Sequence, residues 1–289
     1  MGRDRGYSVC PEASREALRL GEMSAATLGA GVSRTSGFSD VDAAADRPAV
    51  KLFWDCGGVM LDRPSPSALD GIRIIDFSRV VSGPTCSMTL GDMGADVIKI
   101  EEPGCGDESR AFGPPFLGGE SPYYLSVNRN KRSCTVNLKS EAGQAIVWRL
   151  LAHADVLIEN FRPGAMARLG LDYGPVSSRH PALVYCSISG FGDSGTDASR
   201  PGYDLIVQGE AGLMDLTGEA DGPPMRIGTA IADLTAGMMA AQGVTLALYA
   251  RHSTGRGQHV KIAMLDAVAS LLTYNAANYF ASGESPTRR

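Results

Sequence analysis

Short apolar runs alternate with glycine-rich turns and helically spaced stretches from about residue 69 onward. The first run, at 72–77, is rich in β-branched residues and predicts a buried strand. The Gly-Pro pair at 83–84 then predicts the start of a short helix that Gly94 ends. Residues 96–101 predict a second strand, so the three elements form a βαβ unit whose strands are parallel.

The same alternation continues along the chain. The further predicted elements are a long loop at 103–124, strands at 133–138 and 155–160, a strand that runs into a glycine-rich loop at 182–192, and helices at 141–154 and 165–170. Strands and helices that alternate in this way are typical of a doubly wound α/β domain. We therefore predict a Rossmann-like parallel sheet, with ligands bound at the carboxyl ends of its strands.

A lone carboxylate interrupts the small apolar residues of the segment IGTAIADLTAGMM (227–239). Asp233 precedes a long apolar stretch that predicts a helix, and aspartate is a favoured N-cap residue. Burial of an ionised carboxylate is costly, which makes a chemical role the alternative interpretation. This segment alone leaves both interpretations of Asp233 open.

Charge narrows the class of ligand. A net charge of -5 argues against a nucleic acid partner. The loops predicted to begin near Ser78, Glu101, Asn160 and Ser187 lie on one rim of the sheet. Basic side chains are nevertheless predicted near these strand ends, namely Arg79, Arg110, Lys131, Arg132, Arg162 and Arg168. Together they predict an anionic ligand that carries phosphates. No GxGxxG follows the first strand and no P-loop motif is present, which argues against a nicotinamide dinucleotide or a P-loop nucleotide.

Cysteine and histidine positions predict neither a metal site nor a resident cofactor. The six cysteines include no CxxC pair and the four histidines form no HExxH motif. Scattered cysteines fit a reducing compartment, so we expect a cytoplasmic protein. No uninterrupted apolar run reaches the roughly 18 residues of a membrane span, and no membrane partner is predicted.

Residues 1–68 have a different composition, rich in Ala, Gly, Ser and Arg with little periodicity. We interpret them as a disordered leader or as a mis-assigned start, with Met60 as the alternative beginning. The Arg and Ser content also suits a transit peptide, which would direct the protein to the mitochondrial matrix. Acidic residues argue against that alternative, because transit peptides are poor in them; here they are Asp4, Glu12, Glu16 and Glu22.

Several motifs in one order resemble the family III coenzyme A transferases. They are LDGIRIIDFSRVVSGP, GADVIKIEEPGCGDESR, NRNKRSCTVNLKSEAG, DVLIENFRPGAMARLGL, GYDLIVQGEAGLMDLTG, ADLTAGM and STGRGQHVKIAMLDAV. The resemblance runs from about residue 69 to the end and, within the family, is greatest to succinyl-CoA-dependent dicarboxylate transferases. It implies that 69–289 form the large domain with its connecting helices, without the small domain, so that the family fold is incomplete. It also implies a homodimer for the full-length form.

The resemblance assigns a role to Asp233. In these transferases the aspartate at this position attacks the acyl-CoA thioester, forms a mixed anhydride and then an aspartyl–CoA thioester, and passes CoA to a carboxylic acid. The substrates are an acyl-CoA and a small carboxylic acid, and coenzyme A is a substrate thioester rather than a cofactor. A helix N-terminus suits both interpretations of Asp233, since its dipole favours the ionised form.

The resemblance also implies the coenzyme A contacts. The matching positions are Val81, Ser82, Val136, Asn137, Leu138, Lys139, Asn160, Phe161, Arg162, Arg168 and Tyr203. Two positions depart from the formyl-CoA enzymes, because Val81 replaces a glutamine and Glu102 replaces an arginine. Both departures argue against a formyl or oxalate specificity. Arg110 is a candidate partner for the distal carboxylate of a dicarboxylic acid.

Two alternative functions follow from the same motifs. Related α-methylacyl-CoA racemases need a histidine in the sequence GHD, whereas this chain has Tyr203 in GYD. An unperturbed tyrosine titrates near 10 and shuttles protons poorly at neutral pH, which argues against racemase chemistry. The second alternative is an inactive remnant that binds coenzyme A or a partner protein. Asp204 is either a structural hydrogen-bond acceptor or a part of the catalytic site.

Overall fold

The computed structural model describes residues 67–288. The predicted leader (1–68) and the alternative start at Met60 lie outside the described residues, except that residues 67 and 68 of the leader are described.

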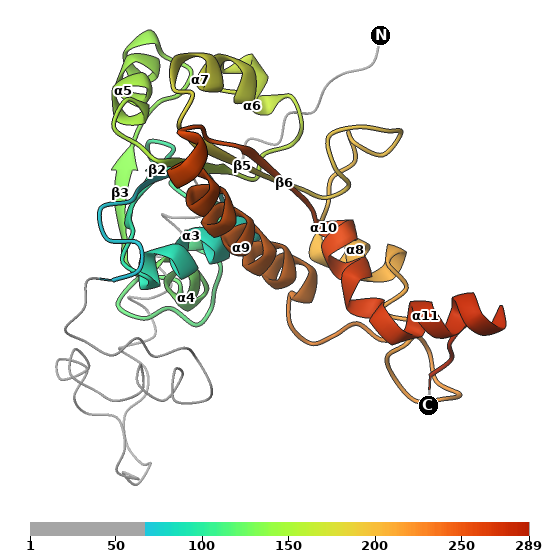
Figure 1. Cartoon of the computed structure of the whole chain (residues 1–289). Helices are drawn as coiled ribbons and strands as arrows, with labels where there is room; N and C mark the ends of the chain where they lie inside the picture. The colour runs from blue at the N-terminus through green and yellow to red at the C-terminus, as the bar shows by residue number, and fades with distance from the viewer. Residues whose placement is uncertain (1–66, 289) are drawn as a thin grey trace, which may run out of the picture. The chain divides into compact units, whose positions relative to one another are not determined.

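Six parallel strands form one sheet in the order β3-β2-β1-β4-β5-β6 (Figure 1). Their bounds are β1 Arg73–Asp76, β2 Asp96–Glu101, β3 Lys131–Thr135, β4 Val156–Glu159, β5 Val184–Ser189 and β6 His259–Ala263. The prediction of a doubly wound α/β fold is confirmed. The strand order changes direction between the neighbours β1 and β4, and ligands of such folds bind at this switch point.

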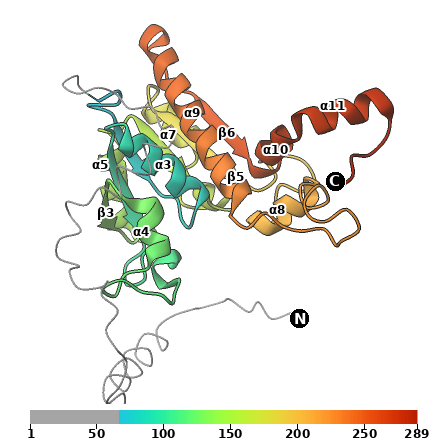
Figure 2. The ribbon, with the colours of Figure 1, turned by 90° about the horizontal axis from the view of Figure 1, so that it is seen from below.

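Helices cover both faces of the sheet (Figures 1 and 2). One face carries α3 (Ser82–Asp92), α4 (Pro122–Asn128) and α9 (Ile231–Thr254), and the other carries α5 (Glu141–Leu151), α6 (Ala165–Arg168) and α7 (Tyr173–Arg179). Successive β1 residues serve opposite faces, since Ile74 packs in the core with α3 and α9 while Ile75 packs with α5 and α7. Both isoleucines are fully buried.

The remaining elements follow the strands or lead to the carboxyl end of the chain. They are α8 (Asp204–Glu210), α10 (Met264–Ala269), α11 (Thr273–Ser282) and the 3₁₀ turns η2 (Glu108–Ala111) and η3 (Ser270–Leu272). Helix α11 buries none of its residues and extends away from the sheet in both views.

Two predicted elements need correction. The third strand begins at Lys131, two residues before its predicted start, because α4 ends at Asn128 and the turn that follows it closes at Asn130, which is left-handed at φ 61. Lys131 and Arg132 therefore pair with the early residues Val97 and Ile98 of β2, away from the carboxyl edge where the sequence placed them. The predicted loop at 103–124 contains η2 and the first residues of α4.

Helix α9 has 24 residues and is, by length and composition alone, apolar enough to cross a membrane. The sequence prediction missed this property, because polar residues interrupt its apolar run. Half of the apolar stretch is buried within the protein, where Ala236, Ala240 and Val244 belong to the core with β5 and α3. The helix is accordingly part of the packed core of the described domain.

Candidate active site

A cleft of ≈ 380 Å³ lies at the carboxyl ends of β1 and β4, where the strand order changes direction. Its lining combines the loop after β1, the loop after β4, the start of α8 and the first turn of α9; it includes Arg79, Val81, Ser82, Asn160, Phe161, Arg162, Tyr203, Asp204 and Asp233. The structure thus brings Asp233 together with six of the predicted coenzyme A contacts.

Asn160 ties the two loops together. Its Oδ1 accepts the backbone N–H of Arg79 at 2.8 Å, and its Nδ2 donates to the Arg79 carbonyl at 2.8 Å and to Ser82 Oγ at 3.1 Å. Gly83 makes the tight turn possible, because a Cβ atom there would lie 2.1 Å from Ser78 Cβ. The loop at 78–82 is consequently fixed against the end of β4.

Asp233 lies in the first turn of α9 and is not its N-cap, so the capping prediction is wrong. The helix begins at Ile231 after Ala230, which has no side chain to cap it. Asp204 performs this function, because its Oδ1 accepts the backbone N–H of Ala232 at 2.7 Å. Its Oδ2 accepts from Gln208 Nε2 at 2.6 Å. The structural interpretation of Asp204 as a hydrogen-bond acceptor is confirmed.

The Asp233 carboxyl has an unusual affinity for protons. Burial and then the negative charge of Asp204 raise its pKa to about 6, although hydrogen bonding from Ser82 opposes this shift. At neutral pH such a group is still largely ionised, yet it is a stronger base than an exposed aspartate. These properties suit an acid that attacks an electrophilic carbon.

Gly237 allows Asp233 and Ser82 to lie side by side. Residues 233 and 237 share one face of α9, which packs on the start of α3. A Cβ atom at Gly237 would lie 2.6 Å from the Ser82 carbonyl oxygen and 2.9 Å from Thr85 Cβ. The absence of a side chain at this position therefore sets the distance between the two helices.

Tyr123, which the sequence analysis did not single out, lies near the two cleft carboxylates but does not line the cleft. It lies in the first turn of α4, and burial followed by the charges of Asp233 and Asp204 raises its pKa. Its ring packs edge to face on Phe112 at 5.2 Å between centroids. The negative charges of both cleft carboxylates therefore disfavour ionisation of the Tyr123 hydroxyl. The signal was the Ser-Pro pair at 121–122, which starts a helix inside the predicted loop.

A second cleft of ≈ 260 Å³ adjoins the first. The predicted contacts Val136, Asn137, Leu138 and Lys139 line it, together with Glu102. Arg79 and Phe161 line both clefts, and the Arg79 guanidinium lies 5.2 Å from the centre of the Phe161 ring. One extended molecule that passes this pair of side chains would contact both groups of predicted residues.

Several predicted basic residues have other partners. Arg110 donates to both Glu101 oxygens at 2.8 Å and to the Tyr124 hydroxyl at 2.6 Å, so its guanidinium is occupied within the protein. Although burial raises the pKa of Glu101, Arg110 and Ser133 hold it down to about 2. Arg168 is exposed at the end of α6 and lines neither cleft. These positions do not favour the predicted ligand contacts of Arg110 and Arg168.

A larger cavity, of ≈ 510 Å³, shares the loop at 161–163 with this cleft and does not include Asp233. Ser187 Oγ lies 2.9 Å from His259 Nε2 there, and burial lowers the pKa of His259 to about 4. We place the candidate site in the smaller cleft, because it holds the perturbed carboxylate at the switch point. Among residues 67–288, no group of three or more His, Cys, Asp or Glu side chains is arranged to hold a metal ion.

Comparison with known proteins identifies the family of the chain. The family model described as CoA-transferase family III matches residues 69–289. The chain belongs to this family. It is 45% identical over 218 residues to the succinyl-CoA:glutarate CoA-transferase of Mus musculus. The matched residues make up 75% of this chain and 50% of that protein. It is also 45% identical over 236 residues to the succinate–glutarate CoA-transferase of Agrobacterium fabrum, with 79% and 59% covered.

A solved family member has the same fold. The crystal structure of a CaiB/BaiF family protein from Brucella suis matches with a TM-score of 0.75 at 44% identity, over 78% of this chain and 60% of that one. The chain thus spans between half and three-fifths of the length of these relatives. The family III domain described here therefore contains the sheet, the switch-point cleft and Asp233.

Proposed function

We propose that this domain transfers CoA from an acyl-CoA to a small carboxylic acid, with Asp233 as the nucleophile. The observation that carries the proposal is the place of Asp233: a partly buried carboxyl with a pKa of about 6, in a cleft lined by six of the predicted coenzyme A contacts. The names of two relatives, both succinyl-CoA or succinate–glutarate transferases, support succinyl-CoA as donor and a dicarboxylic acid as acceptor.

The first half of the reaction loads CoA onto the protein. An Asp233 oxygen attacks the thioester carbonyl carbon of the donor, the C–S bond breaks, and CoA leaves as its thiolate. The thiolate then attacks Asp233 Cγ of the mixed anhydride, which releases the donor acid and leaves an aspartyl–CoA thioester. Ser82, whose hydroxyl and backbone lie close enough to Asp233 to lower its pKa, stabilises negative charge on the carboxylate oxygens.

The second half runs in reverse. The acceptor carboxylate attacks Asp233 Cγ, expels the CoA thiolate and forms a second anhydride, whose acceptor carbonyl the thiolate then attacks. A new acyl-CoA is released and the Asp233 carboxylate is regenerated. Each step exchanges groups of similar energy, so no nucleotide hydrolysis is needed, but water must be kept from the anhydride.

Isotope exchange tests the proposal. Mixing the protein with succinyl-CoA and ¹³C-labelled succinate should move the label into succinyl-CoA. Asp233→Asn should abolish the exchange, while Asp221→Asn, at an exposed position outside the cleft, should leave it unchanged. Equal exchange by the Asp233→Asn protein would contradict the proposal. Coenzyme A binding without exchange in the unaltered protein would favour the binding remnant instead.

A further inference from the structure

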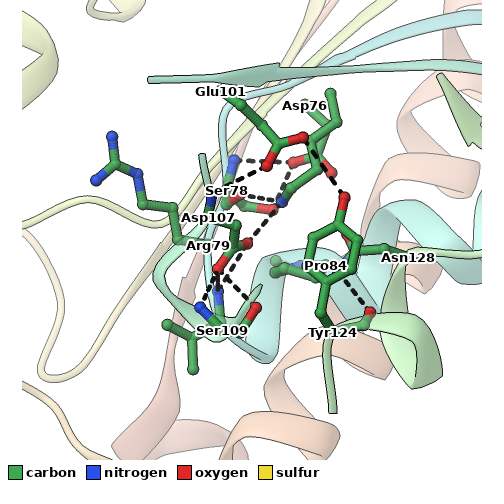
Figure 3. Close-up of polar contacts among 12 residues, drawn as sticks. Asp76, Ser78, Arg79, Pro84, Glu101, Asp107, Ser109, Tyr124 and Asn128 are labelled. Atoms are coloured by element: carbon green, nitrogen blue, oxygen red, sulfur yellow. Dashed lines mark hydrogen bonds and ion pairs between the residues drawn. The ribbon is translucent and has the colours of Figure 1, made fainter. Parts of the chain in front are cut away.

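Two buried ion pairs lie beneath the loop at 78–82 that borders the cleft (Figure 3). Lys99 Nζ is 2.9 Å from Asp107 Oδ2, with the two side chains 1% and 0% exposed. Lys131 Nζ is 3.3 Å from Asp76 Oδ2, and these side chains are 2% and 0% exposed. A buried ion pair adds little to stability, because the cost of desolvating its two charges offsets their attraction. The contacts that these pairs make with the loop therefore suggest another role for them.

Side chains bind three successive backbone N–H groups of this loop. Ser78 donates to Asp76 Oδ1 at 2.8 Å, Arg79 donates to Asn160, and Val80 donates to both Asp107 oxygens at 3.3 Å. Lys99 Nζ also donates to the Ser78 carbonyl at 2.7 Å. The Lys99–Asp107 pair therefore holds the loop at two points, one on either side of Arg79.

Val80 is the strained residue of the loop. Its φ of 66° lies in the left-handed region, which is strongly unfavourable for a β-branched side chain. Such conformations persist only where the surrounding structure holds them, and they cluster at functional sites. The N–H of Val80 is the group that Asp107 binds.

Asp107 is itself firmly held. Its backbone N–H donates to Glu101 Oε1 at 2.8 Å, and its Oδ1 accepts from Ser109 N at 2.9 Å and Ser109 Oγ at 2.7 Å. Arg110 fixes Glu101 in turn. Figure 3 shows Glu101, Asp107 and Ser109 close to Ser78 and Arg79 of the loop. Arg110 thus helps to hold the loop in place through Glu101 and Asp107.

We propose that Asp107 and Lys99 are positioning residues for the transfer reaction, which hold Val80 in its left-handed conformation and thereby fix Val81 and Ser82 in the cleft. The inference rests on the proposed function, since it requires that Ser82 stabilise the Asp233 carboxylate and that the loop contact coenzyme A. A loop released from Asp107 would relax and carry Ser82 away from the Asp233 carboxyl. Displacements of about 1 Å in an active site reduce rates on the order of a hundredfold.

Paired substitutions separate positioning from folding. Lys99→Met with Asp107→Leu removes both buried charges together, a change that buried ion pairs often tolerate without loss of stability. We expect kcat/KM for succinyl-CoA to fall on the order of a hundredfold and the Kd for coenzyme A to rise, with the protein still folded. Lys99→Met with Asp107→Asn keeps an oxygen for the Val80 N–H and should lose less than about tenfold.

Glycine rescue is the decisive step. Adding Val80→Gly to the Lys99→Met/Asp107→Leu protein removes the strain, because glycine adopts positive φ freely. Part of the lost kcat/KM should return. Asn130→Gly is the matched control, since Asn130 has φ 61 outside the loop and its replacement should restore nothing.

The outcomes distinguish this inference from the proposed function. Absence of both exchange and coenzyme A binding in the unaltered protein would overturn the proposed function. Normal exchange and normal coenzyme A affinity in the folded Lys99→Met/Asp107→Leu protein would overturn the positioning role alone. Equal rescue by Val80→Gly and Asn130→Gly would also overturn it, because the effect would then be one of general stability.

Discussion

The Asp204 carboxylate accepts a hydrogen bond from the backbone N–H of Ala232 at 2.7 Å, so an acid from the start of α8 caps the helix that carries Asp233. This contact brings two carboxylates to one helix N-terminus. Asp204 takes the capping hydrogen bond, whereas Asp233 is left with burial and a like charge nearby, and its pKa rises to about 6. Asp204 thus caps helix α9 and also raises the pKa of the nearby Asp233.

Replacing Asp204 by asparagine should change the pH dependence of transfer. Asp233 attacks as a carboxylate, so kcat/KM should rise with pH through about 6 in the unaltered protein. Asp204→Asn keeps an oxygen for the Ala232 N–H but removes the negative charge, which lowers the pKa of Asp233. The acid limb of the pH profile of kcat/KM should therefore move to lower pH, and an unchanged limb would contradict this coupling.

Asp233→Asn should stabilise the protein while it abolishes transfer. The pKa of Asp233 is raised on folding, from near 3.9 in an unfolded chain to about 6, so the folded state prefers the protonated acid. Stability is lost as pH rises through the folded pKa. The variant escapes this loss and should gain roughly 2 kcal/mol of unfolding free energy at pH 7. The gain, measured by urea denaturation, should vanish below about pH 4; a gain that persists there would rule out this origin.

Gly237→Ala should impair both stability and transfer. The new methyl group would meet the Ser82 carbonyl oxygen at 2.6 Å, so α9 must shift away from α3. We expect a loss of about 1–3 kcal/mol in denaturation experiments, with a lower kcat because Asp233 moves with its helix. The matched control is Gly174→Ala in α7, where a Cβ atom meets nothing within 4 Å. Equal effects of the two substitutions would contradict the packing argument.

Arg110→Met should act through structure rather than through substrate choice. It removes two hydrogen bonds to the Glu101 carboxylate and leaves this 4%-exposed acid without its positively charged partner. We expect a loss of about 1–3 kcal/mol in unfolding free energy. Activity should fall by the same factor with monocarboxylic and dicarboxylic acceptors. A loss confined to dicarboxylic acceptors would restore the direct contact that the sequence suggested.

The sequence predicted the fold because apolar periodicity and glycine punctuation determine the order of strands and helices. It also identified most of the cleft, since the loops after β1 and β4 follow directly from a parallel sheet. It missed the partners of charged side chains, because Arg110, Lys131 and Arg132 bind acids 9, 55 and 36 positions away. The cap of α9 was missed for the same reason, as Asp204 is 28 positions from Ala232.

The most direct test of the central claim is the mass of the protein after it is mixed with succinyl-CoA and trapped. Borohydride reduces an aspartyl thioester to homoserine, and hydroxylamine converts the acyl group to a hydroxamate. We expect either change to lie on the peptide that contains Asp233 and to be absent from the Asp233→Asn protein. Transfer activity without modification of Asp233, or modification of another acid, would contradict the assignment of Asp233 as the nucleophile.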